Sequence, residues 1–196
     1  MELYRLRAQA LGTQMDNHFL VNCTTKIALF NQLGRTTLAA EYAMHFVRFL
    51  QRNLRSLRQE TIALTDELEM LKAYAALENN DLHPFILQIE VAETIDLQQI
   101  HIPTFLLQPI VENAIRHGIR NRQEPGGMIT IGISKLNHQL VVEIADNGPG
   151  FSGQSEGNHV SMSIVADRLA LLGKGSRMEY QNLRHGYSVK LFFSIF

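Results

Sequence analysis

The sequence predicts an α+β protein in which an antiparallel helical hairpin precedes a region that mixes helices with strands. Three observations support this fold class. Apolar residues recur at helical spacing through the first 60 residues, several later segments alternate apolar and polar residues, and Gly or Pro separates most segments. A length of 196 residues suits one large domain or two small ones. We therefore divide the chain into a helical-hairpin domain, residues 1–60, and a mixed domain, residues 61–196.

The helical-hairpin domain is predicted from two long apolar patterns. Residues 3 to about 33 follow a helical period without proline, and Gly34 stands where a helix ends in a left-handed residue. A second helix is expected from Thr37 to about Gln59. Helices joined by so few residues pair antiparallel. One hairpin leaves a flank of each apolar stripe uncovered, so we expect two chains to form a four-helix bundle and predict a homodimer through residues 1–60.

The second predicted helix also carries a row of basic side chains. This basic stripe consists of Arg48, Arg52, Arg55 and Arg58. Rows of charge on a helix usually face water, and that is the simpler interpretation. The alternative is a docking surface for an acidic partner or for a phosphate group.

The mixed domain is predicted from a change of period after residue 60. A short extended joint at Thr61–Leu64 leads to a helix that Thr65 caps and that runs to about Asn79. Pro103 is expected to begin the helix that carries the first polar motif below. Strands are expected at residues 85–91, 129–133, 140–144, 177–182 and 187–196, with a further helix near 164–172. We expect the helices to lie on one face of a sheet.

Composition limits the class of protein. The chain is 45% hydrophobic and 19% charged with a formal net charge of −1, which indicates a soluble globular protein and gives no general case for nucleic-acid binding. No apolar run approaches the roughly 18 to 20 residues of a membrane span, and no signal peptide is visible. The lone Cys23 excludes an intramolecular disulfide and a cysteine zinc cluster, so we expect a buried thiol and a cytoplasmic location.

The first polar motif lies on the helix expected after Pro103. In a regular helix Gln108, Glu112 and Arg116 follow one line, and Asn113 and His117 follow the next, while apolar residues fill the opposite arc. An asparagine carbonyl suits Mg²⁺, and the neighbouring carboxylate can orient or activate a group near a transferring phosphate. Arginine and histidine can bind phosphate oxygens. The alternative is an ordinary amphipathic helix with a surface ion pair between Glu112 and Arg116.

The second motif follows a predicted strand with alternating apolar residues. Asp146 ends that strand, so its carboxylate is expected to be partly buried and able to accept a hydrogen bond from an exocyclic amine such as that of adenine. Gly148 and Gly150 let the backbone turn tightly beside a flat ring. Alone, this segment is equally an ordinary turn, and it is neither a P-loop nor a dinucleotide fingerprint. Together the two motifs predict a site for an adenine nucleotide with Mg²⁺.

The two motifs, in this order and with two strands between them, resemble the N-box and first G-box of the GHKL superfamily. The sequence of residues 102–118 resembles the N-box of LytS-type sensor histidine kinases. That branch also carries a Gln-x-x-Pro-His-Phe-Leu-Phe-Asn motif on its first helix, and residues 14–22 stand at the matching place. Its next stretch fits Leu64, Glu67, Leu68, Tyr74 and Glu78, and Arg168-Leu169 fits its arginine–leucine pair after the lid.

This resemblance implies a fold and a set of partners. The hairpin would be the dimerisation and phosphoacceptor domain, and residues 61–196 would form a Bergerat-type α/β sandwich that binds ATP and Mg²⁺. The implied function is that of the sensor histidine kinase core of a two-component system, with autophosphorylation on histidine and transfer to the aspartate of a response-regulator receiver domain. A membrane would be reached only through a sensor segment that is absent from this chain.

The resemblance also implies roles for single residues. His18 would be the phosphoacceptor, because a neutral imidazole nitrogen is a good nucleophile near neutral pH. Glu112 would assist at the γ-phosphate, Asn113 would hold Mg²⁺, and Asp146 would read adenine. The remaining nucleotide-binding positions would be Arg116, His117, Gly148, Gly150 and Arg168.

Several positions depart from the family pattern. Asn17 replaces the proline before the histidine, Val21 replaces the second phenylalanine, and Asp81-Leu82 stands in place of an arginine–phenylalanine pair. The second glycine box is replaced by His159-Val160-Ser161-Met162, and the family's following asparagine is Ile164. A glycine box at this place would expose backbone N–H groups to the phosphates. The departures concern the phosphate end of the site and leave the adenine end intact.

Two other functions are open from the sequence. One is a degenerate, pseudokinase-like relative that signals as a dimeric scaffold, or as a histidine phosphotransfer protein, with weak or no use of ATP. The altered second glycine box motivates it. The other is a GHKL ATPase or serine kinase without a histidine step, against which the hairpin with His18 argues.

Overall fold

The structure is a computed structural model that describes residues 17–79, 83–150 and 157–194. Its helices are α2 (Asn17–Gln32), α3 (Thr36–Ser56), α4 (Leu64–Glu78), α5 (Gln108–Asn113), the π-helical η1 (Ala114–Gly118), the 3₁₀-helical η2 (Ile119–Asn121) and α6 (Gly157–Ala170). Its strands are β1 (Thr61–Ala63), β2 (Phe85–Val91), β3 (His101–Pro103), β4 (Gly127–Leu136), β5 (Gln139–Asp146), β6 (Arg177–Asn182) and β7 (Tyr187–Ser194). None of the helices in these ranges combines the length and the apolar character that crossing a bilayer requires.

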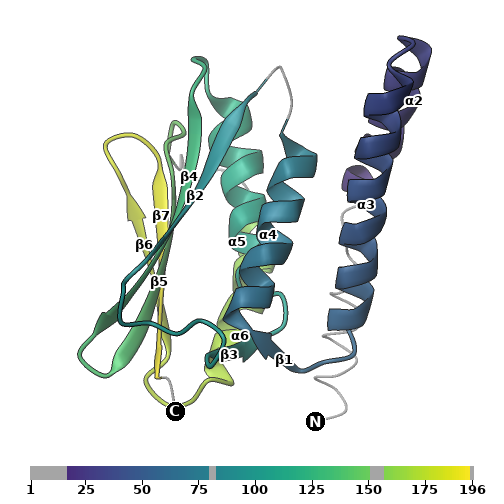
Figure 1. Ribbon diagram of the computed structural model, residues 1–196. Helices are drawn as coiled ribbons and strands as arrows, with labels where there is room; N and C mark the ends of the chain where they lie inside the picture. The colour runs from purple at the N-terminus through teal and green to yellow at the C-terminus, as the bar shows by residue number, and fades with distance from the viewer. Residues whose placement is uncertain (1–16, 80–82, 151–156, 195–196) are drawn as a thin grey trace.

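A five-stranded sheet forms the centre of the mixed region, with strand order β2-β4-β5-β7-β6. Strands β2 and β4 are parallel, and the other pairs are antiparallel. Helices α4, α5 and α6 lie on one face of this sheet, as Figure 1 shows. The predicted α+β class and the prediction of helices on one face are therefore confirmed.

The alternating residues of the central strands face those helices. Ile129, Ile131 and Ile133 on β4 are buried, and so are Leu140, Val142 and Ile144 on β5. Because Ile131 lies opposite Ile144 and Ile133 opposite Val142, the two strands present one continuous apolar surface. Each such side chain stabilises the fold by roughly 1.5–3 kcal/mol.

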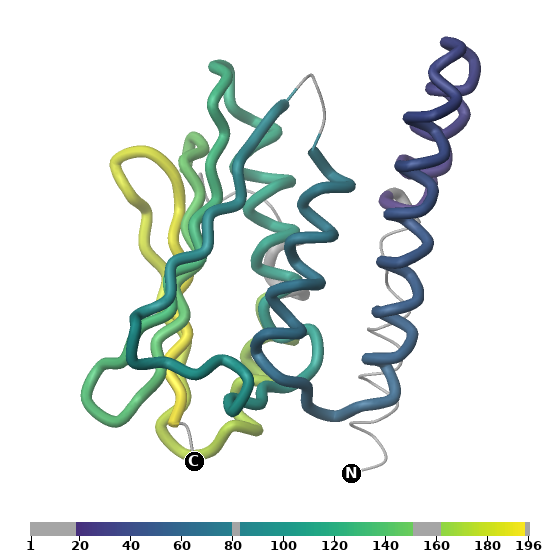
Figure 2. Tube along the Cα trace, in the orientation of Figure 1, coloured from purple at the N-terminus to yellow at the C-terminus, as the bar shows by residue number. Residues whose placement is uncertain are grey.

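The helical hairpin of α2 and α3 packs on α4, on the side of α4 that faces away from the sheet (Figure 2). Gly34 ends the first helix with φ +71°, in the left-handed conformation predicted for it. The ring of Phe19 lies 5.0 Å from that of Tyr74 on α4 and 5.4 Å from that of Phe49 on α3. Cys23 is buried in the same contact, as expected. The buried core is therefore continuous from the hairpin to the sheet across residue 60.

Polar contacts reinforce the packing of the hairpin on α4. The hydroxyl of Tyr42 donates a hydrogen bond to the carbonyl oxygen of Leu77 at 2.9 Å, and the Lys26 ammonium donates to the same oxygen at 2.8 Å. Helix carbonyls in the last turn have no partner within their own helix, so these two donors complete the end of α4.

The prediction that Pro103 begins a helix is wrong. Pro103 ends strand β3, which pairs with β1 so that Ile62 lies opposite Ile102. The helix begins five residues later at Gln108, and Pro109 occupies its first turn, where a missing N–H costs nothing. Pairing between strands about 40 residues apart gives no local sequence signal.

Other boundaries also differ from the predictions. Helix α3 ends at Ser56, and α6 begins at Gly157, seven residues earlier than the predicted start. The N-cap of α4 is Ala63, so Thr65 is not the capping residue, and its hydroxyl is buried without a hydrogen-bond partner. Strand β1 determines this start, because the chain is extended through Ala63.

Candidate functional site

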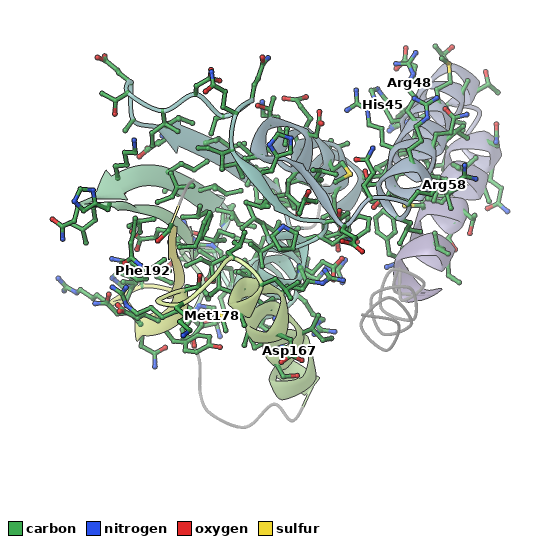
Figure 3. The ribbon with its side chains drawn as sticks, turned by 90° about the horizontal axis from the view of Figure 1, so that it is seen from below. His45, Arg48, Arg58, Asp167, Met178 and Phe192 are labelled. Atoms are coloured by element: carbon green, nitrogen blue, oxygen red, sulfur yellow. The ribbon has the colours of Figure 1, made fainter. Side chains whose placement is uncertain are left out.

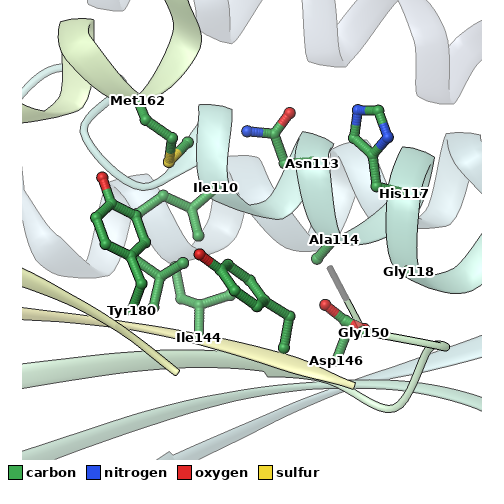
Figure 4. Close-up of a pocket in the computed structure, with 12 residues that line it drawn as sticks. Ile110, Asn113, Ala114, His117, Gly118, Ile144, Asp146, Gly150, Met162 and Tyr180 are labelled. Atoms are coloured by element: carbon green, nitrogen blue, oxygen red, sulfur yellow. The ribbon is translucent and has the colours of Figure 1, made fainter. Parts of the chain in front are cut away.

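A cavity of about 290 Å³ lies between the α5–η1 segment, helix α6 and strands β5, β6 and β7 (Figure 4). It brings together four predicted site residues, Asn113, His117, Asp146 and Gly150. Its other lining residues are Ile110, Ala114, Gly118, Ile144, Met162, Tyr180, Tyr187 and Val189. The two motifs, about 30 residues apart in the chain, thus face one cavity.

Asp146 lies at the floor of the cavity at the end of β5. It is only 7% exposed, and its carboxylate accepts hydrogen bonds from the backbone N–H of Gly148, at 2.8 Å, and of Tyr187. Burial raises the pKa of Asp146 to about 6, although the two N–H donors and the nearby Arg122 oppose the rise. The carboxylate therefore remains mostly ionised at pH 7 and keeps lone pairs for an exocyclic amine.

Three glycines surround Asp146 so closely that a side chain at any of them would collide. A Cβ on Gly118 would lie 2.4 Å from Asp146 Oδ1, and a Cβ on Gly148 would lie 2.5 Å from Gly118 Cα. A Cβ on Gly186 would lie 1.7 Å from the carbonyl oxygen of Asp146. Gly148 is thus packed against Gly118 and does not itself line the cavity, so its contact with a nucleotide stays a prediction, whereas Gly118 and Gly186 were not predicted as site residues. The sequence does mark both positions, because Gly118 ends the first motif and Gly186 lies in the turn of the closing hairpin.

Asn147 fastens the loop after Asp146 to the neighbouring turn. Its side-chain oxygen accepts the N–H of Met128 at 2.8 Å, and its amide nitrogen donates to the carbonyl of Gly126 at 3.0 Å. The Arg122 guanidinium donates to the carbonyl of Asn147. These bonds fix the loop that follows Asp146 to the turn before β4.

The walls of the cavity are apolar and aromatic. Tyr180 and Tyr187 stack with ring centroids 6.3 Å apart and an interplanar angle of 27°. Met162 and Ile110 lie near Tyr180 in Figure 4, and Asp146 lies below Asn113 and His117. A slot with two rings, aliphatic walls and one carboxylate suits a flat heteroaromatic ring that carries an amine. The tyrosines were missed because their role depends on the pairing of β6 with β7.

At the opposite end of the cavity Asn113 and His117 both bind Arg116, which lies outside the cavity lining. Arg116 donates from Nη2 to Asn113 Oδ1 at 3.1 Å and from Nε to His117 Nε2 at 3.0 Å. Burial and the charge of Arg116 both lower the pKa of His117, so its imidazole is neutral at pH 7 and can accept that bond. Glu112 accepts a hydrogen bond from Gln108 at 2.8 Å. Glu112 and Arg116 are not among the residues that line the cavity.

The helix that bears these groups is not the regular helix that was predicted. It changes at Ala114 to a π-helix that runs to Gly118 and then to a 3₁₀ turn. A π-helical turn holds more residues than an α-helical turn, so side chains beyond Ala114 rotate relative to the expected lines. Gln108 and Glu112 keep their i, i+4 contact, whereas Arg116 contacts Asn113 at i, i+3.

The donor set suits Mg²⁺ only as part of a nucleotide complex. The described residues contain no group of three or more His, Cys, Asp or Glu side chains that would hold a metal by themselves. Mg²⁺ bound to phosphates keeps several waters and needs one or two protein oxygens. The amide oxygen of Asn113 is an oxygen of the required kind, and in the structure it accepts a hydrogen bond from Arg116.

The structure does not bring Arg168 to this cavity. It is 5% exposed, its guanidinium donates to the carbonyl oxygen of Phe105, and it lies near the carboxylate of Glu67. The cause is its place on the face of α6 that packs on the core beside Val165 and Leu169.

Most of the other sequence departures lie in parts that the structure describes only by their backbone or leaves out, whereas Val21 is exposed on α2 and Ile164 is half-buried on α6. The backbone of His18 lies in the first turn of α2. Residues 159–161 lie in the first half of α6. The motif positions 14–16, the Asp81-Leu82 pair and residues 151–156 fall outside the described residues.

Comparison with known proteins finds sensor proteins and histidine kinases that are similar to this chain. The family model for "Histidine kinase" matches residues 6–83. The chain is 30% identical to the sensor protein LytS of Oceanobacillus iheyensis, over 96% of this chain and 34% of that protein, and 30% identical to the sensor histidine kinase BtsS of Escherichia coli, over 81% of this chain and 28% of that protein. It spans about a third of the length of these curated relatives.

The fold is similar to that of a solved histidine kinase domain. The domain from the blue-light activated histidine kinase of Erythrobacter litoralis superposes with a TM-score of 0.56. The superposition covers 95% of this chain and 94% of that domain at 12% identity, so it speaks to the fold alone.

Proposed function

Because the chain belongs to the histidine kinases, on the branch of LytS-type sensors, we propose that it is the kinase core of a two-component sensor. In this proposal it transfers the γ-phosphoryl group of ATP to His18 and then to an aspartate of a response regulator. The residues act on the cytoplasmic side, where ATP and the regulator are found. The observation that carries the proposal is the buried, glycine-enclosed Asp146 facing Asn113 and His117 across one cavity.

Asp146 and the apolar walls would bind the base of ATP. The carboxylate accepts the exocyclic amine of adenine, and Tyr180, Tyr187 and Met162 contact the faces of the ring. A buried acceptor left without a donor is costly, so a base that lacks the amine is disfavoured. Gly150 and Gly118 allow the backbone to approach the nucleotide.

The side chains that hydrogen-bond to one another at the other end of the cavity would bind the phosphates. Arg116 and His117 would donate to phosphate oxygens, and Asn113 would hold Mg²⁺, which neutralises phosphate charge when it is bound. A nitrogen of His18 attacks the γ-phosphorus, the N–P bond forms, and the bond to the β-phosphate oxygen breaks with release of ADP. Glu112 accepts the proton that the imidazole loses.

We propose a dimer through the hairpin. Exposed apolar side chains repeat along both helices: Val21 and Leu29 on α2, and Met44, Val47 and Leu54 on α3. The three on α3 are separated by three and by seven residues, as in a helix–helix seam with a heptad repeat. A second hairpin would cover them in a four-helix bundle.

Dimer formation is tested by sedimentation. Val47→Glu should convert the dimer to a monomer, because a carboxylate would be buried in the seam. Ile86→Glu changes a still more exposed apolar residue on β2 and should leave the dimer intact. A monomeric wild-type protein, or equal effects of both variants, contradicts the hairpin dimer.

The basic stripe would receive the regulator. Arg48, Arg52, Arg55 and Arg58 are all exposed, and Figure 3 labels Arg48 and Arg58 on the hairpin. Receiver domains carry acidic residues around the aspartate that is phosphorylated, so a row of guanidinium groups has complementary charge. The exposure of these four arginines also fits a face that only contacts water, so the docking role belongs to the proposal.

Labelling with γ-³²P-ATP and Mg²⁺ tests the phosphotransfer. The wild-type protein should acquire acid-labile label that His18→Gln and Asn113→Ala both lose. His45→Gln, a change of an exposed histidine on the same hairpin, should keep it. Label that survives His18→Gln removes the acceptor. ATP binding without label supports the degenerate relative, which the replacement of the second glycine box at residues 159–162 motivates.

A further inference from the structure

A buried carboxylate outside the cavity contacts the start of the helix that lines it. Glu67 on α4 is fully buried, and the site described above does not use it. Its Oε2 accepts the backbone N–H of Phe105 at 3.0 Å, and its Oε1 accepts that of Leu107 at 3.1 Å. Desolvation raises the pKa of Glu67 to about 7, against the effect of these donors and of Arg168. A carboxylate is rarely buried so completely unless its partners are specific.

Phe105, one of the two residues that donate to Glu67, has a strained backbone. Its φ is +58°, a conformation that residues with a side chain rarely adopt. Its N–H is held by Glu67 from α4, and its carbonyl oxygen is held by the Arg168 guanidinium from α6. Such strain persists only where the surroundings determine it, and it is frequent at functional sites.

The strained residue stands immediately before the nucleotide-facing helix. Leu107 is the N-cap of α5, and the first N–H groups of a helix have no partner within it. The carboxylate of Glu67 supplies that partner from another helix. Asn113 and His117 follow on the same segment and line the cavity. Helix α4 meanwhile carries Tyr74, which packs against the hairpin.

We propose that Glu67 and Arg168 are positioning residues that hold Phe105 from two sides and thereby fix α5, with Asn113 and His117, relative to α4 and α6. This inference rests on the proposed function for its affinity readout. It gives Arg168 a role that differs from direct contact with the nucleotide. It also makes α4 the element that contacts both the hairpin and the start of the nucleotide-facing helix.

The test compares Glu67→Gln with Glu69→Gln. Glu69 lies on the same helix, is exposed and pairs with Lys72, so its change removes a carboxylate without touching Phe105. A glutamine at 67 can accept only through one oxygen, and it leaves one N–H group without an acceptor. Glu67→Gln should weaken binding of a fluorescent ATP analogue about tenfold, and Glu69→Gln should leave it within about twofold.

Amide hydrogen exchange distinguishes positioning from a purely structural role. Glu67→Gln should speed exchange in residues 108–121 and leave the paired strands β4 and β5 as slow as in the wild-type protein. A lower melting temperature with unchanged affinity and unchanged exchange in residues 108–121 overturns the proposal. If the wild-type protein binds no ATP, the proposed function fails, and the exchange comparison alone decides the positioning role.

A substitution of Arg168 provides a second test of the proposal. Arg168→Met keeps an unbranched apolar stem, although a shorter one, and removes both the donor to Phe105 and the charge beside Glu67. The double variant Glu67→Gln/Arg168→Met should bind the analogue no more than about threefold more weakly than either single variant, because both act through one residue. If the affinity loss of the double variant equals the product of the two single losses, Glu67 and Arg168 act independently, and the proposal that both act through Phe105 is contradicted.

Discussion

At the Asp146 end of the cavity the contacts come from buried backbone and a carboxylate, whereas at the Asn113 end they come from side chains that bind one another. Asp146 is held by two backbone N–H groups and enclosed by three glycines. Arg116, by contrast, is exposed and bonds to the same groups that would receive Mg²⁺ and phosphate. In the proposed function the base end would therefore be preformed, and the phosphate end would have to exchange its internal hydrogen bonds for bonds to the ligand.

The largest expected effect comes from filling the preformed end. Gly118→Ala would place a methyl group 2.4 Å from Asp146 Oδ1, so the carboxylate or the η1 segment must move. Overpacking of this kind costs about 1–3 kcal/mol or more, and we expect ATP affinity to fall roughly 100-fold. Equilibrium titration with a fluorescent ATP analogue measures the loss.

Gly132→Ala is the matched control for that change. Gly132 lies on β4 of the same sheet, and a Cβ there meets nothing within 4 Å. Its affinity should stay within about twofold of the wild-type value, with an unchanged circular dichroism spectrum. Equal losses in the two variants would show that the enclosure around Asp146 has no special part in binding.

Asp146→Asn tests the acceptor itself. Asparagine keeps the shape of the side chain but replaces one acceptor oxygen with a donor. We expect ATP and adenosine to lose affinity by the same factor, roughly 100-fold, because a buried donor would then face the amine of the base. The exposed Asp167→Asn on α6 is the control. A loss for ATP without a loss for adenosine would place Asp146 at the phosphates.

The fold could be predicted where the signal is local. Alternation in β4 and β5 was enough because one face of each strand is buried, and Gly34 marked a helix end by its conformation. The start of the nucleotide-facing helix could not be predicted. Pairing of β1 with β3 extends Pro103, and Glu67 holds the following loop from about 40 residues away. These contacts depend on tertiary structure.

The site residues could likewise be predicted where they belong to a local motif. Asp146, Asn113 and His117 stand in motifs whose residue types suit a nucleotide, and the structure places all three at one cavity. The tyrosine pair was not predictable, because Tyr180 and Tyr187 meet only through the register of β6 and β7. The buried position of Arg168 was not predictable for a related reason, because which face of α6 packs inward depends on the elements that it contacts.

The pH dependence of binding offers a finer test of the base end. Burial raises the pKa of Asp146 to about 6, and the amine of adenine requires the ionised form. Affinity should therefore be complete above pH 7 and should fall as the pH drops through 6, by about tenfold between pH 7 and pH 5. The same slope should appear with adenosine, and Asp146→Asn should remove it. A slope seen with ATP alone would instead reflect the phosphates or His117.

The smallest change in ATP affinity is expected at the Asn113 end, where Arg116 bonds to Asn113 and His117. Arg116→Ala removes a phosphate donor but also frees Asn113 Oδ1 and His117 Nε2, which the guanidinium occupies in the structure. The two consequences oppose each other, so ATP affinity should fall only about threefold to tenfold, while adenosine affinity stays unchanged. The exposed Arg184→Ala on the β6–β7 turn controls for the lost charge. Because freeing Asn113 favours Mg²⁺, the affinity of ATP for the variant should reach its plateau at a lower Mg²⁺ concentration than for the wild-type protein. An equal Mg²⁺ requirement in both proteins would mean that Arg116 does not compete for the amide oxygen, and that the phosphate end is as preformed as the base end.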